Sequence, residues 1–419
     1  MRESLASLAK IHYGKSPNEV AFVDGTIPIV GTGGIYGQAS RALFDKGIVV
    51  ARKGSLGKPY LFQTPFWPVD TTYAVVPFEG VCIEWLYYCL LDFDLTKLNE
   101  ATGVPSINRN WLAKITFHNP GSAQQKRVAE VITTIDIAIE QTEALIEKYQ
   151  HIKAGLMHDL FTRGVLPSGQ LRPPRDQAPE LYQDTGIGWI PRGWAVAPLE
   201  AILHESGGYL QTGPFGSQLH AHEYQTEGIP VVMPQDIKEG KIGTDTIARI
   251  SEKRVVSLAK HQLKIGDIII ARRGELSRAA AVSEREQGWL CGTGCFLLRL
   301  GRTDLNHFFF SHIYRYDYIQ RQIAGTQVGT TMPSLNNSVL GRVQFPCPTP
   351  NEQCDISTRL SNADAETNTL KDHAAKLRLQ KLGLMQDLLT GKVPVNEIEG
   401  VATDGRYQNP KTSLSPDPI

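Results

Sequence analysis

The chain has no excess of either charge, no long apolar run and no signal core. Its 43 lysine and arginine residues balance 43 aspartate and glutamate residues, so its net charge gives no bulk argument for nucleic-acid binding. Any DNA-binding surface must therefore be local. No apolar run approaches the roughly 18 residues that a membrane helix needs, and the N-terminal MRESLASLAK is not a secretion signal. These absences predict a cytoplasmic chain without a membrane segment.

The cysteines and histidines do not form a metal-binding pattern. No C-x-x-C pair occurs among the six cysteines, so reduced and mostly buried thiols are the favoured interpretation. His220 and His222 are two residues apart, but no further ligand stands at metal spacing, which favours solvated loop histidines. We expect no metal. The cysteines are Cys82, Cys89, Cys291, Cys295, Cys347 and Cys354.

Catalytic motifs are missing as well. The sequence contains no G-x-S-x-G, no H-E-x-x-H and no Walker loop. The stretch NPGS at 119–122 shares only its first two letters with the N-P-P-aromatic loop of adenine methyltransferases, and it lacks the aromatic that stacks a flipped base. We therefore expect no catalytic residues and no methylation by this chain.

One glycine-rich stretch, IPIVGTGGIYG at 27–37, raises the possibility of a phosphate loop. Gly31 and Gly33 fit the G-x-G-x-x-G fingerprint, but the third position is Tyr36 and the glycine comes one residue late, at Gly37. The favoured interpretation is a strand that runs into a tight turn, where glycine supplies positive φ.

The chain is an internal duplication. KAGLMHDLFTRGV at 153–165 recurs as KLGLMQDLLTGKV at 381–393, with eight identities in thirteen positions and an offset of 228. At the same offset, PSIN at 105–108 recurs as PSLN at 333–336. One large module is therefore present twice, which differs from a short-period solenoid.

Earlier matches show that the second copy has gained loops. VVARKGSLGK at 49–58 matches IIARRGELSR at 269–278 with an offset of 220, and IPIV at 27–30 matches IPVV at 229–232 with an offset of 202. The second copy has MPQD where the first has GTGG, which argues further against a phosphate loop.

Each copy consists of a head followed by a long helix. Short β-rich runs punctuated by glycine and proline predict compact α/β heads, and a capping box opens each helix, Ser122 with Gln125 and Thr349 with Glu352. We predict an α+β protein with two globular heads joined by two long helices packed as an antiparallel coiled coil. The predicted segments are 1–121 and 192–349 for the heads, 122–163 and 350–391 for the helices, 164–191 for an extended linker and 392–419 for a tail.

Heptad seams support the helix pairing. The first seam alternates steps of three and four, and the second repeats every seven residues with a poorer companion row at Arg359, Glu366 and His373. The open alternatives are that each helix packs on its own head or mediates homodimerisation. The first seam is Val128, Val131, Ile135, Ala138, Thr142, Leu145, Tyr149, Ile152 and Leu156, and the second is Ile356, Ala363, Leu370, Leu377 and Leu384.

Basic and polar residues follow matching β runs in the two heads. Arginine and lysine can bind guanine edges or phosphates, and nearby glycines let the backbone approach. A strand end that is merely exposed to solvent would show the same residues, so these clusters alone are weak evidence for DNA contact. Two divergent heads on a spacer suit two half-sites of an asymmetric target. The candidate DNA-facing residues are Tyr36, Gln38, Arg52, Lys53, Ser55, Lys58, Gln218, Arg272, Arg273, Ser277 and Arg278. The matched Asn108 and Asn336 are expected to fix the loop before each helix, a structural role that is favoured over base contact.

The order of parts resembles the specificity subunit of type I restriction-modification systems over nearly the whole chain. The resemblance is carried by IPIVGTGGIYG, KGIVVARKGSLGK, FWPVDTTYAVV, PGSAQQKRV, GLMHDLFTRG and DTGIGWIPRGW. It implies two target recognition domains on an antiparallel coiled coil, each reading half of a bipartite double-stranded DNA site. It also implies two methyltransferase subunits as partners, which recruit restriction subunits, with S-adenosylmethionine, ATP and Mg²⁺ used only in those partners.

The chain departs from the family pattern in its missing first entry motif and in the poorer seam of its second helix, and two other function classes remain open. No counterpart of GWIPRGW precedes the first copy, and the tail is expected to complete it. A coiled-coil scaffold whose heads bind protein is the main alternative, followed by a nucleotide-binding enzyme. Candidates for the helix pair or the methyltransferase interface are Val128, Ile135, Leu145, Ile152, Leu156, Met157, Leu370, Leu377, Leu384 and Met385.

Overall fold

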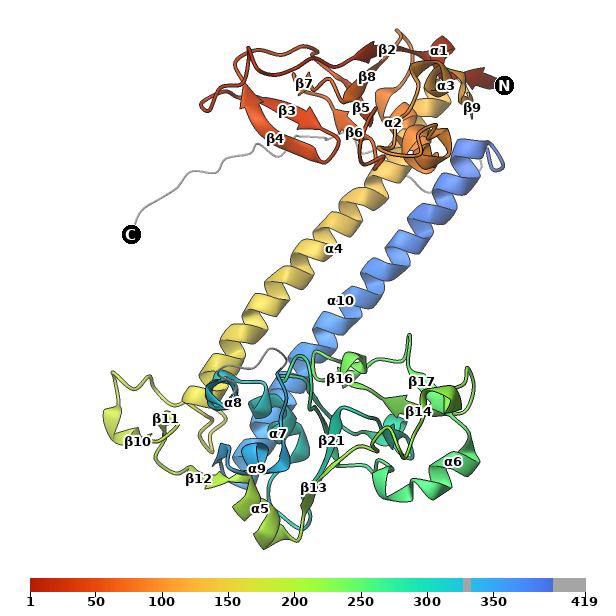
Figure 1. The fold of residues 1–419 in the computed structure, drawn as a ribbon. Coiled ribbons are helices and arrows are strands. Elements are labelled where there is room, and N and C mark those ends of the chain that lie inside the picture. The colour runs from red at the N-terminus through yellow and green to blue at the C-terminus, as the bar shows by residue number, and fades with distance from the viewer. Residues whose placement is uncertain (327–332, 395–419) are drawn as a thin grey trace. The chain divides into compact units, whose positions relative to one another are not determined.

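The computed structural model describes residues 1–326 and 333–394. Contacts divide the chain into two compact units, the first formed by residues 1–145 with the segment from 370 onward, and the second by residues 146–369 (Figure 1). Each unit contains one head and a part of both long helices. The predicted tail lies outside the described residues from 395 onward, and so does the idea that it completes the first head.

The first head contains three small sheets. The largest is antiparallel in the order β2-β8-β5-β6, the second has the order β4-β3-β7 with β3 and β7 parallel, and β1 pairs with β9. The strands are β1 (Arg2–Ser4), β2 (Ala9–Tyr13), β3 (Ile27–Gly31), β4 (Gly34–Ala39), β5 (Gly47–Ala51), β6 (Tyr60–Phe62), β7 (Trp67–Pro68), β8 (Thr72–Pro77) and β9 (Thr116–His118). The helices are α1 (Leu5–Leu8), α2 (Ile83–Asp92), η1 (Leu95–Leu98) and α3 (Arg109–Lys114).

The second head repeats this plan. Its sheets have the orders β13-β21-β18-β19, β17-β14-β20 with β14 and β20 parallel, and β12-β22. Two hairpins, β10-β11 and β15-β16, have no counterpart in the first head. The strands are β10 (Tyr182–Thr185), β11 (Gly188–Pro191), β12 (Ala195–Pro198), β13 (Tyr209–Thr212), β14 (Ile229–Val232), β15 (Ile237–Lys238), β16 (Lys241–Ile242), β17 (Ala248–Ile250), β18 (Ile268–Ala271), β19 (Ala279–Ala281), β20 (Leu290–Cys291), β21 (Cys295–Arg299) and β22 (Gln344–Cys347).

Helices complete the second head. They are α5 (Leu199–Ser206), α6 (Glu252–Ser257), α7 (His307–Tyr314), α8 (Asp317–Gly325) and α9 (Asn337–Gly341), with short 3₁₀ turns η2 (Pro179–Leu181), η3 (Ala221–Glu223), η4 (Pro234–Asp236), η5 (Ala259–His261) and η6 (Glu284–Glu286). The matching sheet orders show that the sequence duplication is a duplication of fold.

The long helices are α4 (Ser122–Thr162) and α10 (Pro350–Thr390), of 41 residues each. The start of one and the end of the other pack into the same head core. In the first unit, Val128 and Ile132 of α4 join Leu388 of α10 in one buried cluster with the head residues. In the second unit, Leu160 of α4 and Ile356 of α10 do the same. Both predicted packings therefore occur, since the helices contact a head and also each other.

The predicted capping boxes form only in part, because the Thr349 hydroxyl accepts from the Glu352 amide at 3.5 Å as expected, whereas the Gln125 and Glu352 side chains bond elsewhere. The Gln125 side chain accepts a hydrogen bond from the Cys82 amide at 2.9 Å and donates to Asn119 Oδ1 at 2.8 Å, so it bridges two head segments. Its duplicate Gln353 accepts from the Asn306 amide at 2.7 Å. Glu352 also bonds to distant residues. These side chains are buried, and tertiary partners replace the reciprocal bond back to the cap residue.

Every second residue of the predicted α4 seam lies on the buried face. Each residue between them was predicted one position too early. Ile132 and Ile139 are buried, whereas Leu145 and Ile152 are 43% and 51% exposed. The buried residues are spaced by four and then three positions, whereas the predicted seam was spaced by three and then four. Val131–Ile132, Ala138–Ile139 and Leu145–Ile146 are adjacent apolar pairs, so the sequence pattern fits both phases.

The companion row of α10 is likewise one residue later than predicted. It consists of Leu360, Thr367, Ala374, Lys381 and Leu388, while Glu366 and His373 are exposed. Leu156 and Met157 pack against the core of the second unit, and Leu384 and Met385 belong with that of the first. Leu370 and Leu377 are half-buried.

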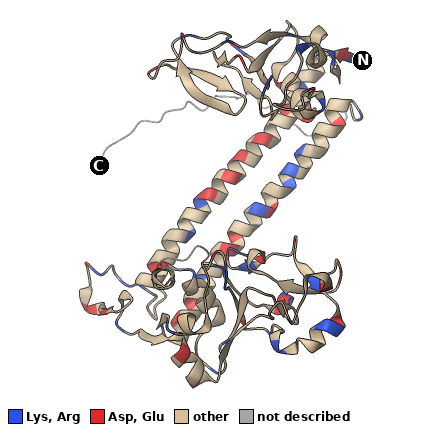
Figure 2. Cartoon of the chain, viewed as in Figure 1, with Lys and Arg blue, Asp and Glu red and all other residues tan. Residues whose placement is uncertain are grey.

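Charge also connects the helices. Figure 2 shows both acidic and basic residues along α4 and α10. Lys381 Nζ lies 2.5 Å from Asp136 Oδ1 in the first unit, and Lys153 pairs with Asp364 in the second. The two pairs are related by the offset of 228, so each helix contributes one lysine and one aspartate. In the first unit Arg378 also pairs with Glu143, and in the second Leu160 and Ile356 share one cluster, so the paired residues run in opposite order along the two helices and the helices are antiparallel in each unit.

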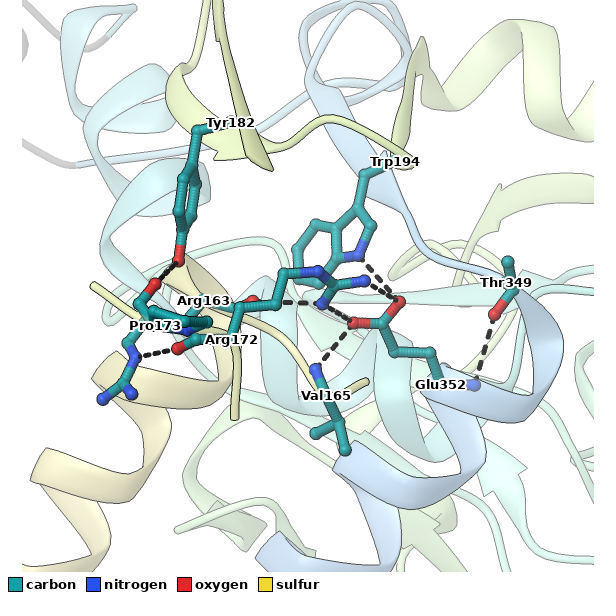
Figure 3. A network of polar contacts seen from close by, with 8 residues as sticks. All are labelled: Arg163, Val165, Arg172, Pro173, Tyr182, Trp194, Thr349 and Glu352. Atoms are coloured by element: carbon teal, nitrogen blue, oxygen red, sulfur yellow. Dashed lines mark hydrogen bonds and ion pairs between the residues drawn. The ribbon is translucent and has the colours of Figure 1, made fainter. Parts of the chain in front are cut away.

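The linker is folded and is not the extended connection that its prolines predicted. Gly164, with φ of 63°, ends α4, and residues 165–171 then turn back with a bridge between Val165 and Leu171. The Glu352 carboxylate accepts from the Val165 amide at 2.7 Å and from the Trp194 indole at 3.0 Å, and it pairs with Arg172 (Figure 3). This buried network fastens the linker to the first turn of α10.

No helix in residues 1–326 and 333–394 is long and apolar enough to cross a membrane.

Candidate nucleic-acid interface

The glycine-rich stretch is a hairpin. Gly31 and Gly34 are paired across the β3–β4 turn, and Gly34 has φ of 104°, which a side chain would disfavour. A Cβ on Gly54 would lie 3.8 Å from Thr32 Oγ1, so this turn lies beside the loop that follows β5. The tight-turn interpretation is confirmed. The turn is one wall of the region that holds the first head's candidate residues.

The two strand-end loops are built alike, because two of the repeated motifs contact each other. After β5, the Arg52 carbonyl accepts from the Ile107 amide at 2.9 Å, and Lys53 bridges to Ser106. After β18, the Arg272 carbonyl accepts from the Leu335 amide at 2.9 Å, and Arg273 bridges to Ser334. The basic strand end and the P-S-(Ile/Leu)-N segment therefore form one unit in each head.

The matched asparagines cap helices. Asn108 Oδ1 accepts from the Asn110 amide at 2.8 Å at the start of α3, and Asn336 Oδ1 accepts from the Val339 amide at 2.8 Å at the start of α9. The expected structural role of both residues is therefore confirmed.

In the first head the predicted DNA-facing residues differ in whether their side chains are already bonded within the head. Arg52 Nη1 donates to the Asp70 carbonyl at 3.0 Å, so this side chain helps to hold the loop. Lys53, Ser55 and Lys58 are exposed. Their positions suit contact with a large partner, and this role stays a prediction.

Tyr36 and Gln38 lie on β4. The Tyr36 side chain is 64% exposed, and partial burial followed by the charge of Asp70 raises the pKa of its hydroxyl. It therefore remains a hydrogen-bond donor at neutral pH. In the orientation that satisfies its surroundings, the Gln38 amide nitrogen donates to the Val23 carbonyl at 3.1 Å. That contact gives Gln38 a structural partner.

In the second head several of the predicted DNA-facing side chains already bond to other groups of the head. Arg272 Nε donates to the Leu335 carbonyl at 3.0 Å, and its guanidinium lies 5.8 Å from the centre of the Phe296 ring. Arg278 pairs with Glu275 at 2.8 Å and donates to the Pro234 carbonyl at 3.1 Å. Arg278 is thus neutralised by its neighbour.

The remaining candidates of the second head form a smaller set. Ser277 Oγ donates to Glu275 at 3.3 Å, and Gln218 Oε1 accepts from the Phe215 amide at 3.2 Å. Arg273 is exposed, and within the described part of the chain its side chain makes no hydrogen bond or salt bridge. The free cation of this loop is therefore Arg273.

Two residues of the first head were missed by sequence reasoning. Tyr13 ends β2, and the guanidinium groups of Arg52 and Arg109 lie 5.0 and 5.1 Å from the centre of its ring. These residues are far apart in the sequence and come together only because β2 pairs with β8 beside β5. The one sequence signal was Arg109 directly after the repeated motif PSIN.

Histidines outside these loops do not add a metal site. The rings of His220 and His222 stack at 5.4 Å, and the adjacent Glu223 carboxylate is used by Arg254 and by the His220 amide. Among the described residues, no group of three or more histidine, cysteine, aspartate or glutamate side chains is placed to hold a metal ion.

Comparison with known proteins agrees with the duplicated architecture. The model of the type I restriction modification DNA specificity domain matches residues 3–149 and 216–379, once in each copy. The MjaVIII specificity subunit of Methanocaldococcus jannaschii is 23% identical over 323 residues, covering 75% of this chain and 71% of that protein. The EcoDI specificity subunit of Escherichia coli is 20% identical over 403 residues, covering 92% and 86%.

A solved structure shows the same fold. The S subunit of a type I restriction-modification system from M. genitalium superposes with a TM-score of 0.62 at 17% identity, covering 93% of this chain and 96% of that one. The family model matches well over half of the chain, and it does so in both copies. The chain therefore belongs to the type I restriction-modification DNA specificity family.

Proposed function

We propose that this chain is the DNA sequence-specificity subunit of a type I restriction-modification complex. Its two heads read the two halves of an asymmetric bipartite site, and its helices carry the methyltransferase subunits, which recruit the restriction subunits. The chain has no catalytic role of its own. S-adenosylmethionine, ATP and Mg²⁺ belong to the partner subunits.

The observation that carries this proposal is the repeated loop unit. Each head presents a basic strand end braced by the P-S-(Ile/Leu)-N segment, at Lys53 in the first head and at Arg273 in the second. Equivalent construction with different side chains suits two heads that do the same task on different sequences. The divergence of the loops makes the two half-sites unequal.

The long helices also offer an exposed surface for the methyltransferase partner. Leu379 and Leu382 are 70% and 61% exposed, and Leu145 on α4 is 43% exposed. Exposed leucines three residues apart on a helix form a small apolar stripe that a partner helix can cover. We assign this stripe to the methyltransferase interface, together with the outward helix positions.

The test is base-resolution methylation mapping of the host genome with the gene present and deleted. The expected result is one split, asymmetric motif that loses methylation on deletion. Reintroducing the chain with Arg273→Ala should reduce methylation at that motif. If no motif changes while the complex is expressed, the heads bind something other than DNA, and a protein-binding scaffold becomes the better description.

A further inference from the structure

The first head carries two arginines on one tyrosine. The guanidinium groups of Arg52 and Arg109 lie 5.0 and 5.1 Å from the centre of the Tyr13 ring, within the range of cation–π attraction. Tyr13 is 46% exposed and Arg109 is exposed, so the cluster is open to solvent. We call Tyr13, Arg52 and Arg109 the Arg–Tyr–Arg cluster.

The positive charge of the cluster is not neutralised within the head. In the described part of the chain neither arginine forms a salt bridge with a carboxylate. Arg52 donates one hydrogen bond to the Asp70 carbonyl, which carries no net charge. The tyrosine ring attracts both cations and cancels neither charge. Both guanidinium groups lie within 5.1 Å of the same ring centre, and an anion with several oxygens can be their common partner.

The second head lacks this arrangement at equivalent positions. Tyr13 is paired with Tyr73 in the sheet, and Thr212 is paired with Phe296 at the matching place in the other sheet, so Thr212 replaces Tyr13. Asn337 replaces Arg109, directly after the matched cap, and its Nδ2 donates to the Leu210 carbonyl at 3.0 Å. Only Arg272 remains of the two arginines.

We propose that the Arg–Tyr–Arg cluster binds a phosphate of the DNA backbone, so that the first head has a two-arginine phosphate contact that the second head lacks at the equivalent position. This rests on the proposed function. The cation–π contacts with Tyr13 hold both guanidinium groups at one ring, and their N–H groups can donate to phosphate oxygens. Phosphate contacts position a protein on DNA without reading bases, so this cluster sets affinity and register and leaves base reading to the neighbouring loops.

The test uses the assembled complex of this chain with its methyltransferase subunits and two duplexes of equal length. One carries the motif identified by methylation mapping, and the other carries a scrambled motif. Affinity is measured between about 50 and 200 mM salt. Arg109→Ala should weaken binding to both duplexes by a similar factor and should make the negative slope of log affinity against log salt shallower by about 0.9. Asn337→Ala, the matched control in the second head, should leave the slope unchanged.

Variants of the tyrosine separate stacking from hydrogen bonding. Tyr13→Phe keeps the ring and should behave as the unmodified chain, whereas Tyr13→Leu should lower affinity on both duplexes. Because Arg109 is exposed, Arg109→Ala remains informative even if Tyr13→Leu does not fold.

Two results would overturn the proposal and leave the proposed function standing. One is an unchanged salt slope for Arg109→Ala in a complex that still prefers the motif duplex. The other is a loss confined to the motif duplex, which would make the cluster a reader of bases. Failure of the unmodified complex to distinguish the two duplexes would instead overturn the proposed function and this inference with it.

Discussion

The Glu352 carboxylate and the Arg172 guanidinium form a bidentate pair, with Nη1–Oε1 and Nη2–Oε2 distances of 2.5 and 3.2 Å. Only 7% and 13% of their side-chain surfaces are exposed. The same carboxylate accepts from the Val165 amide and the Trp194 indole, so removing it leaves three groups without their acceptor. Glu352→Ala should therefore lower the free energy of unfolding by about 3–5 kcal/mol.

Denaturant titration of the full chain checks this value. Gln124 stands at the matched position of the first copy and is half-buried, with no such network. Gln124→Ala should cost less than about 1 kcal/mol. Equal costs for the two substitutions would show that the network does not stabilise the linker.

The pair Lys381–Asp136 should be energetically coupled more strongly than the neighbouring pair Arg378–Glu143. Its side chains are 20% and 29% exposed, against 57% and 46% for the second pair. Screening by water is weaker where the charges are covered. Double-mutant cycles with alanine should give a coupling of about 1 kcal/mol for Lys381–Asp136 and at most about 0.5 kcal/mol for Arg378–Glu143. The reverse order would contradict the role of the duplicated pair.

Stability should depend on pH through His312. Burial, followed by the charges of Arg315 and Lys153, lowers the pKa of His312 to about 3. The unfolded chain takes up a proton near pH 6.5 and the folded chain does not, so His312 contributes its full stability above pH 6.5 and loses it as the pH falls toward 3. The loss is at most about 1.4 kcal/mol per pH unit.

Denaturation at pH 7 and pH 5 compares the chain with His312→Gln. Glutamine can still accept the hydrogen bond that Arg315 donates to His312 Nδ1 at 2.8 Å. The variant should lose less stability between the two pH values. His151→Gln is the control, since that side chain is 80% exposed. An unchanged pH dependence in His312→Gln would assign the effect to other groups.

Arg273 and Arg278 should differ in their effect on DNA binding although they lie in one loop. Arg273 is exposed and has no side-chain partner among the described residues, whereas Arg278 is paired with Glu275. In the assembled complex Arg273→Ala should weaken binding by about 1–3 kcal/mol if it contacts a base. Arg278→Ala should have a smaller effect, and the half-site read by the first head should be unaffected by either change. Equal losses would show that the Glu275 pair opens on DNA.

The sequence alone determined the duplication, the two long helices and the order of the parts. Apolar heptads over 41 residues and repeated motifs at one offset are local or directly comparable signals, so no tertiary information was needed. The repeated Asn108 and Asn336 could be read as loop-fixing residues for the same reason, because capping acts within a few residues.

The tertiary structure decided which of the repeated residues are free. Arg272 and Arg278 look like Arg273 in the sequence, but the Leu335 carbonyl from another segment binds Arg272, and the Glu275 carboxylate of the same loop binds Arg278. The phase of the α4 seam was decided by the head that it meets, since adjacent apolar residues satisfy either phase. The Arg–Tyr–Arg cluster joins strand β2, the loop after β5 and helix α3, and contacts between residues that distant depend on sheet pairing, which side-chain periodicity does not encode.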